Sequence, residues 1–195
     1  MCEERDGRLS RADRGRRDRL RRRVRLLLMV VIAGLALSGL TAFPIETELR
    51  CAARLLGIEP GARPEGLGAV ARWLVTVRDA VIATNAAYPF LAYGTDWLAF
   101  AHLVIAVAFI GPLRDPVRNA WVITFGLMAC VGVFALALLA GPVRGIPWFW
   151  TVVDCSFGVG CGIPLLLCRR YVRELEAMDR VSSRVAAGAA SVETA

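Results

Sequence analysis

NAWVITFGLMACVGVFALALLAG, residues 119–141, contains no charged side chain. As a helix this run would be about 34 Å long, which matches the roughly 30 Å hydrocarbon core of a bilayer. Three further blocks, 24–43, 97–113 and 147–168, are also predominantly apolar. With 56% hydrophobic residues and a mean hydropathy of +0.53, the chain is more apolar than a typical soluble domain. The sequence therefore predicts four transmembrane helices.

The predicted fold is an all-α, four-helix transmembrane bundle. Two of its connections, RDPVR at 114–118 and PVRGI at 142–146, are so short that the last three spans must run antiparallel in series. Asp115 is expected to N-cap the third span, with Pro116 at the first helical position. The parts expected are an Arg-rich cytoplasmic tail (1–23), a membrane domain (24–168) with an extracytoplasmic segment (44–96), and a cytoplasmic helix with a disordered tail (169–195).

The first apolar block has a second interpretation, as a signal peptide cleaved after Ala42. Its polar leader is more than twenty residues long, and the block itself is long enough to cross a bilayer. Both features favour a retained span.

The extracytoplasmic segment is expected to be helical. A short helix from Thr47 to Leu56 would end at Gly57. Beyond the turn-rich EPGARPEG, apolar residues spaced three or four apart predict an amphipathic helix, with Arg78 off the apolar stripe. The stripe comprises Leu67, Val70, Leu74, Val77 and Val81. Such a helix either packs on the bundle or lies in the membrane interface.

Arginine sets the predicted orientation, because all 24 basic residues are Arg and the formal net charge is +7. With the N-terminus inside, the inner segments hold eighteen Arg and the outer segments six, in agreement with the positive-inside rule. We therefore expect both termini in the cytoplasm. The basic N-terminal tail has no aromatic residue to stack on bases, so membrane lipids rather than nucleic acid are its expected partners.

The sequence lacks the common catalytic and cofactor motifs. There is one His, no CxxC pair, and no HExxH, GxSxG, P-loop or dinucleotide-binding glycine pattern. We expect no metal, no cofactor and no catalytic residue, and the chain is interpreted as more compatible with a non-enzyme. Other membrane proteins are possible partners, and the sequence does not predict the oligomeric state.

Four polar residues are predicted to lie inside the membrane at one depth near the outer face. His102 is five residues past Trp97 and Asp154 six past Trp148, about 7.5–9 Å down each helix. Ser38 and Thr41 lie at the corresponding end of the first span. A His102–Asp154 contact would form either a structural clasp between helices or part of a proton relay or substrate site.

Small residues and flanking charges complete the candidate site. Asp154, Gly158 and Gly162 share one face of the fourth span, where a GxxxG pattern permits close helix approach. Pro164 is expected to kink that helix or to open it, which would free carbonyl groups. Gly34, Ser38 and Ala42 form a similar face on the first span. The predicted outer-mouth charges are Glu46, Asp96 and Arg144.

Three stretches resemble an uncharacterised group of small four-span bacterial membrane proteins. They are YGTDWLAFAH (93–102), RDPVRNAWV (114–122) and RGIPWFWTVVDCSFG (144–158). The resemblance implies a bacterial inner-membrane location and carries no activity with it.

Three functions follow from these observations. The first is an accessory or scaffold membrane protein, which asks least of the polar residues. The second is a small ion- or proton-linked transporter that uses the His102/Asp154 layer. The third is a membrane enzyme acting on a lipid or quinone at the outer leaflet.

Overall fold

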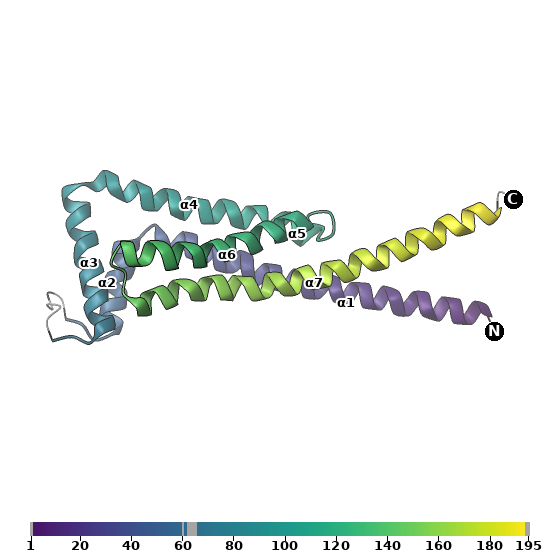
Figure 1. Ribbon diagram of the computed structural model, residues 1–195, viewed down its shortest axis with the longest axis horizontal. Helices are drawn as coiled ribbons and strands as arrows, with labels where there is room; N and C mark the ends of the chain where they lie inside the picture. The colour runs from purple at the N-terminus through teal and green to yellow at the C-terminus, as the bar shows by residue number, and fades with distance from the viewer. Residues whose placement is uncertain (1, 60, 62–65, 194–195) are drawn as a thin grey trace. The chain divides into compact units, whose positions relative to one another are not determined.

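The computed structural model describes residues 2–59, 61 and 66–193, with side chains described between residues 13 and 184. These residues form helices and no strand (Figure 1). The elements are α1 (Cys2–Ala42), α2 (Ile45–Leu55), α3 (Ala69–Ala87), the 3-10 helix η1 (Pro89–Leu91), α4 (Ala92–Ala108), α5 (Ile110–Arg114), α6 (Ala120–Val143) and α7 (Trp148–Glu193).

Four segments are long and apolar enough to cross a membrane, as the sequence predicts. They are Asp13–Ala42, Pro89–Arg114, Ala120–Val143 and Trp148–Arg184. Their outward faces carry large apolar side chains: Leu136 is 69% exposed, Leu139 74% and Met128 69%. Soluble proteins rarely expose contiguous apolar surface of this kind, whereas lipid covers it at no cost. The prediction of an all-helical protein with four helices long and apolar enough to cross a membrane is confirmed for the described residues.

The chain divides into two compact units. Unit 1 comprises Met1–Ala33 and Val107–Ala195, and unit 2 comprises Gly34–Ala106. Helix α1 therefore contributes its N-terminal part to unit 1 and its last residues to unit 2.

In unit 1, α1 and α7 pack antiparallel along a buried apolar seam. The seam residues recur three or four positions apart, which places them on one face of each helix. They are Leu20, Val24, Leu28 and Val31 on α1, and Leu165, Cys168, Val172 and Leu175 on α7. The Cys168 thiol donates to the Val24 carbonyl oxygen over 3.7 Å, which fixes the register of the two helices.

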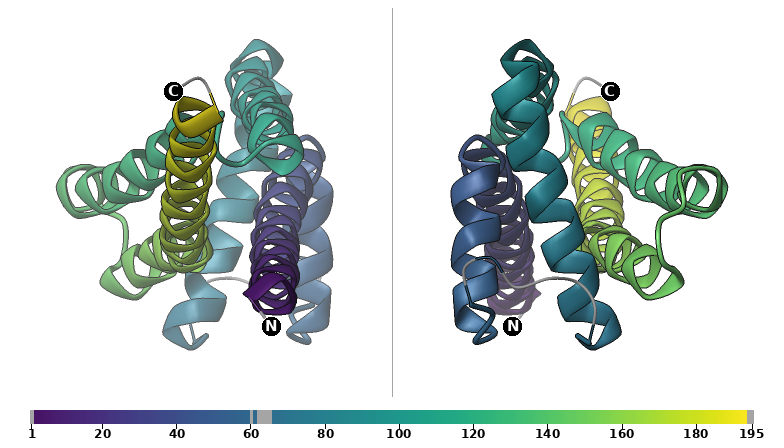
Figure 2. Two further views of the ribbon diagram at one scale, coloured as in Figure 1. Left: turned by 90° about the vertical axis from the view of Figure 1, so that its right-hand side faces the viewer. Right: turned by 90° about the vertical axis from the view of Figure 1, so that its left-hand side faces the viewer.

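Helices α6 and α7 of unit 1 also lie side by side (Figure 2). Their connection begins with a Schellman motif at the end of α6. Ile146 N–H donates to Gly141 O at 2.9 Å and Gly145 N–H to Pro142 O at 3.2 Å. Gly145 has φ +70°, a conformation that residues with a Cβ rarely adopt. The tight turn leads directly into α7.

Unit 2 contains a hairpin of α2 and α3. A second Schellman motif ends α2, where Gly57 has φ +68° and Ile58 N–H donates to Ala53 O at 3.0 Å. Ala53 and Ile58 are both buried and pack with Val75 of α3. This contact between residues on either side of the helix end is the apolar element that accompanies such caps.

Three details differ from the sequence predictions. Helix α6 begins at Ala120, so Asp115 caps a turn instead of the helix, its Oδ1 accepting from Arg118 N–H at 3.1 Å. Helix α7 continues through Pro164 without interruption, so the broken-helix alternative is wrong. It also continues to Glu193, over most of the tail that was expected to lack structure.

Candidate functional site

Asp154 shares a face of α7 with the two glycines that pack on α6. A Cβ built on Gly158 would lie 2.9 Å from the Phe134 ring and 3.1 Å from the Cys130 carbonyl oxygen. On Gly162 it would lie 3.8 Å from Cys130 Cβ, an ordinary contact. Gly158 is therefore the point of closest approach, as the GxxxG pattern predicts.

The Asp154 carboxyl group is half-buried one helical turn before Gly158. Among the residues with described side chains, no hydrogen bond or ion pair to it is present, and none joins it to Arg144, which is exposed at the end of α6. A carboxylate in an apolar layer costs about 2.5–3.5 kcal/mol on insertion scales. An acid retained at such a position is the strongest chemical signal in the spans.

His102 is half-buried in α4, and its ring bonds within its own helix. Nδ1 lies 2.8 Å from the Leu98 carbonyl oxygen. Because a carbonyl oxygen only accepts, Nδ1 must carry the proton, which leaves Nε2 as an acceptor in the neutral ring. His102 belongs to unit 2 and Asp154 to unit 1, so their pairing stays a prediction.

The close-packed glycine of the first span is Gly39. A Cβ there would lie 2.8 Å from the Ala99 carbonyl oxygen, whereas a Cβ on Gly34 would meet nothing within 4 Å. Ser38 is exposed, and the Thr41 hydroxyl donates to its carbonyl oxygen at 3.3 Å. The face expected from Gly34, Ser38 and Ala42 is therefore rotated from the one that packs on α4.

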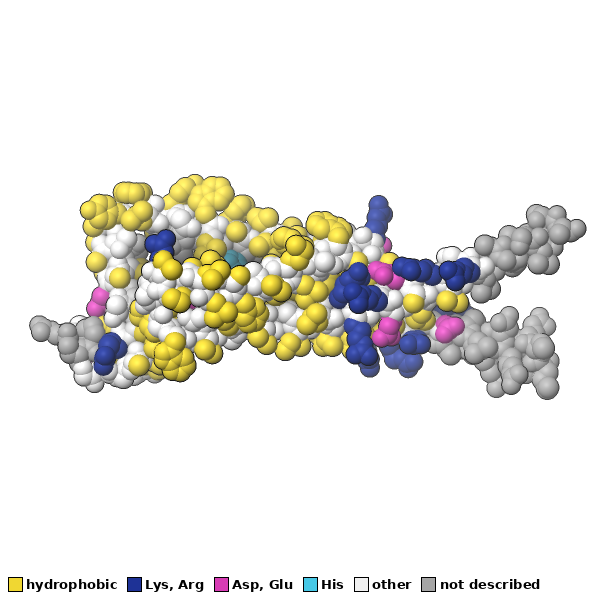
Figure 3. All heavy atoms as spheres, in the orientation of Figure 1, with side chains coloured by type: hydrophobic (Ala, Val, Ile, Leu, Met, Phe, Trp, Pro, Cys, Tyr) yellow, Lys and Arg dark blue, Asp and Glu magenta, His cyan; other side chains and the backbone are white. Residues whose placement is uncertain are grey.

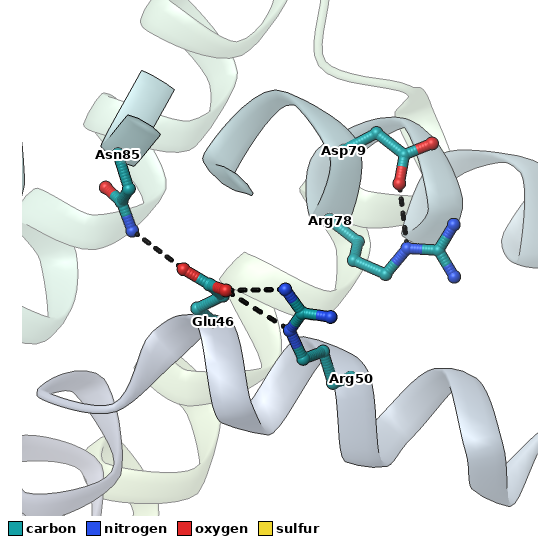
Figure 4. Close-up of polar contacts among 5 residues, drawn as sticks. All are labelled: Glu46, Arg50, Arg78, Asp79 and Asn85. Atoms are coloured by element: carbon teal, nitrogen blue, oxygen red, sulfur yellow. Dashed lines mark hydrogen bonds and ion pairs between the residues drawn. The ribbon is translucent and has the colours of Figure 1, made fainter. Parts of the chain in front are cut away.

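Glu46 joins the start of α2 to the end of α3. Its Oε1 accepts from Arg50 Nη2 at 2.7 Å and Arg50 Nε at 3.2 Å, and its Oε2 accepts from Asn85 Nδ2 at 3.3 Å (Figure 4). These bonds from Arg50 and then Asn85 lower the pKa of the Glu46 carboxyl group below its ordinary value. The sequence identified Glu46 but not Asn85, because a contact across 39 positions leaves no local pattern.

Arg78 is buried in the α2–α3 hairpin, which corrects the expectation that it lies on the polar face of α3. Its residue is 8% exposed, and its Nε donates to Asp79 Oδ1 at 2.8 Å (Figure 4). The packed residues are Val75 and Ala71 together with Leu67 and Leu74 of the predicted stripe. Val70 of that stripe is 55% exposed, so the packed face only partly coincides with the predicted one. A guanidinium group pairs with a neighbouring carboxylate here, while its aliphatic stem packs.

Neither a metal centre nor a polar cage is evident in the described part of the chain. No group of three or more His, Cys, Asp or Glu residues that could hold a metal ion lies there. Asp96 is half-buried near the start of α4, with no hydrogen bond to a described side chain.

The other polar concentration lies where α1 and α7 continue past their apolar segments. We call α1 residues 13–23 together with α7 residues 169–184 the helical arm. Arg16 pairs with Glu174 at 3.3 Å, and Arg17 pairs with Asp179 at 3.1 Å. Arg17 Nη2 also donates to the Met178 carbonyl oxygen at 2.9 Å. A shallow pocket of about 500 Å³ lies beside these pairs, lined by Val117, Glu176, Asp179, Arg180, Ser183 and Arg184.

Comparison of the chain with protein-family models, with curated proteins and with solved structures found no match. The class of protein therefore rests on its own fold: an all-helical protein with four helices able to cross a membrane.

Proposed function

We propose that the chain is a multi-pass protein of the bacterial cytoplasmic membrane with both termini in the cytoplasm. Two observations support this orientation. Eighteen of the 24 Arg lie in the segments assigned to the inside. The polar ends of α1 and α7 are paired with one another in unit 1, as Arg17 with Asp179, so they belong on one side of the membrane. The hairpin of α2 and α3 is then extracytoplasmic.

Within this topology we propose an accessory or scaffold role, exerted through the helical arm. The observation that carries the proposal is the polar and apolar pairing of α1 with α7 beyond the apolar segments. Leu175 is 2% exposed there and Val172 is fully buried, although both lie past the last apolar residues of the span. A tail that served only as a charged anchor would need no such interior.

The arm is held mainly by its apolar seam. Fully burying a Val or Leu side chain contributes about 1.5–3 kcal/mol, whereas partly exposed ion pairs such as Arg16–Glu174 contribute about 0–1 kcal/mol each. The surface charges of the arm are therefore available for recognition without loss of its structure. A paired, stiff projection of this kind suits a protein that positions a partner at the membrane.

Site-specific photocrosslinking in the native host tests the scaffold role. A photoreactive residue replaces Val181, which is 62% exposed on the arm, and in a matched control replaces Val143, which is 83% exposed at the far end of α6. The proposal predicts an adduct of constant mass with another protein at Val181 and none of that mass at Val143. The absence of any adduct at Val181, or the same adducts at both positions, would contradict it.

A proton-linked transporter is the second candidate, and the half-buried Asp154 carboxyl group favours it. Without a bonding partner among the described side chains, this group is free to take up and release a proton or a cation. Proteoliposomes containing a trapped pH indicator separate the two roles. The scaffold role predicts no protein-dependent proton flux. Flux that Asp154→Asn abolishes would overturn it in favour of transport.

A further inference from the structure

We infer that six exposed arginines at the base of the helical arm bind the phosphate groups of anionic phospholipids. We call them the arginine collar; they are Arg22, Arg25, Arg114, Arg118, Arg170 and Arg173. All belong to unit 1, and the inference does not depend on the accessory role. Figure 3 displays dark-blue arginine side chains gathered where the yellow apolar surface ends.

The collar arginines differ from the arginines that pair with acids of α7. Glu174, Glu176 and Asp179 are the acids of α7 between residues 169 and 184, and they pair with Arg16, Arg169 and Arg17 respectively. Every acid of this part of α7 is therefore engaged. Among the described side chains, none forms a hydrogen bond or ion pair with a collar guanidinium group. The collar thus consists of free cations, whereas Arg16 and Arg17 are paired within the arm.

The collar arginines of α1, of α7 and of the turn before α6 lie at similar heights along α7. The contact of Val24 with Cys168 puts Arg25 and Arg22 beside α7 residues close to Arg170. Gly126 packs against Leu165, and α6 begins six residues earlier at Ala120, so the turn containing Arg118 lies near the height of Arg173. At 1.5 Å per residue these positions fall within about 9 Å along α7. A headgroup layer is about 5–8 Å thick on each side of a bilayer.

Exposed apolar side chains border the collar. On the membrane side of it, Leu26 is 49% exposed, Leu166 59% and Trp121 68%. A guanidinium group beside exposed apolar surface suits an amphiphile, with its phosphate on the arginine and its acyl chains along the helix. Trp121 occupies the interfacial level where tryptophan is enriched. A soluble phosphate ion would make no use of the apolar border.

The outer part of α7 also carries arginines, but in different surroundings. Arg180 and Arg184 are exposed on the same helix, but they lie about 15 Å and about 21 Å beyond Arg170. Val181 is the one large apolar residue exposed beside them among the described side chains of 176–184, so their apolar border is much smaller than that of the collar. They carry the same charge as Arg170 and Arg173. Position relative to the apolar surface, rather than charge alone, therefore distinguishes the collar.

Native mass spectrometry of the full chain in detergent tests the inference with two charge-matched variants. Phosphatidylglycerol and phosphatidylcholine are titrated against the wild type, against Arg170→Gln/Arg173→Gln and against Arg180→Gln/Arg184→Gln. Each arginine beside an anionic surface changes affinity about fivefold, so the collar variant should bind phosphatidylglycerol about 25-fold more weakly. The outer variant should change by less than about twofold.

The outcomes discriminate between sources of the anion and between kinds of partner. Equal losses in both variants, or equal affinity of the wild type for the two lipids, would overturn the inference. Competition by millimolar inorganic phosphate would also overturn it, by assigning the site to a soluble anion. Unchanged phosphatidylglycerol binding in the collar variant would overturn the inference and would favour an acidic protein as the partner of these arginines. Melting temperatures of both variants equal to that of the wild type verify that neither variant has lost its fold.

Discussion

Replacing Gly158 by Ala should destabilise the α6–α7 pair, although alanine is the better helix former. The added methyl group would lie 2.9 Å from the Phe134 ring and 3.1 Å from the Cys130 carbonyl oxygen. The ring can turn aside, but the carbonyl oxygen is backbone and moves only with α6. Gly162→Ala is a matched control one turn further along α7, because its methyl group would make an ordinary contact of 3.8 Å with Cys130.

The magnitude follows from two opposing contributions. Overpacking costs about 1–3 kcal/mol, and the higher helix propensity of alanine returns up to about 1 kcal/mol. Gly158→Ala should therefore lower the free energy of unfolding by up to about 2 kcal/mol, which corresponds to up to about 8 °C in melting temperature for a chain of this size. Gly162→Ala has only the propensity contribution and should be neutral or stabilising by up to about 1 kcal/mol.

Two assays measure stability in the same mild detergent. The first is thermal unfolding monitored by far-ultraviolet circular dichroism, and the second is unfolding by titration with a denaturing detergent. The two measurements should rank the proteins in the same order, with Gly162→Ala at or above the wild type and Gly158→Ala below it. If Gly158→Ala is as stable as Gly162→Ala, the close approach of the two helices at Gly158 is refuted.

Two further predictions concern unit 2. Gly39→Ala should destabilise the chain by about 1–3 kcal/mol, because its methyl group would lie 2.8 Å from the Ala99 carbonyl oxygen, whereas Gly34→Ala should cause no such loss. The same melting assay compares the two variants. Equal stability of the two would contradict the packing described for α1 and α4. The lowered pKa of Glu46 means that its bonds add stability above the ordinary value of 4.5, and this contribution is lost as the pH falls through the lowered pKa. The melting temperature of the wild type should therefore exceed that of Glu46→Gln at pH 7, and the gap should close in acid below pH 4.5; a gap that stays constant with pH would refute the role of the ionised carboxylate.

The four spans are predictable from sequence because hydropathy and length are properties of each segment alone. Residues 119–141 are predicted to span a membrane from their own length and hydropathy, without reference to the rest of the chain. Gly158 is likewise predictable, since GxxxG marks a face on which a second helix can approach. The helix end at Gly57 is predictable because glycine readily adopts the positive φ of a helix C-cap.

The choice between helix faces is not predictable in the same way. The first span offers Gly34 and Gly39, which lie on different faces, and only the position of α4 decides that Gly39 is the packed one. In α3, Val75 packs with Ala53 and Ile58 of the facing segment, and Arg78, one turn further along the helix, is buried despite its charge. Such selections depend on tertiary contacts between distant segments, as does the bond from Asn85 to Glu46.

The helical arm is only partly predictable from the sequence. Val172 and Leu175 indicate an amphipathic helix after the last span, and Leu20 and Val24 lie four apart on α1. The sequence does not predict that the apolar stripes of α1 and α7 face each other. Their apposition requires both chain ends on one side of the membrane, so the arm and the proposed topology support one another.

The side of the membrane on which each segment lies is the central claim, and labelling of single cysteines tests it most directly. Cys51 is exposed in α2, and Val181→Cys supplies an exposed position on the arm; each is made the only cysteine in its variant. A membrane-impermeant maleimide is then applied to right-side-out and to inverted vesicles. The account predicts that Cys51 reacts in right-side-out vesicles and residue 181 in inverted ones. Reaction of both positions from the same side would contradict it.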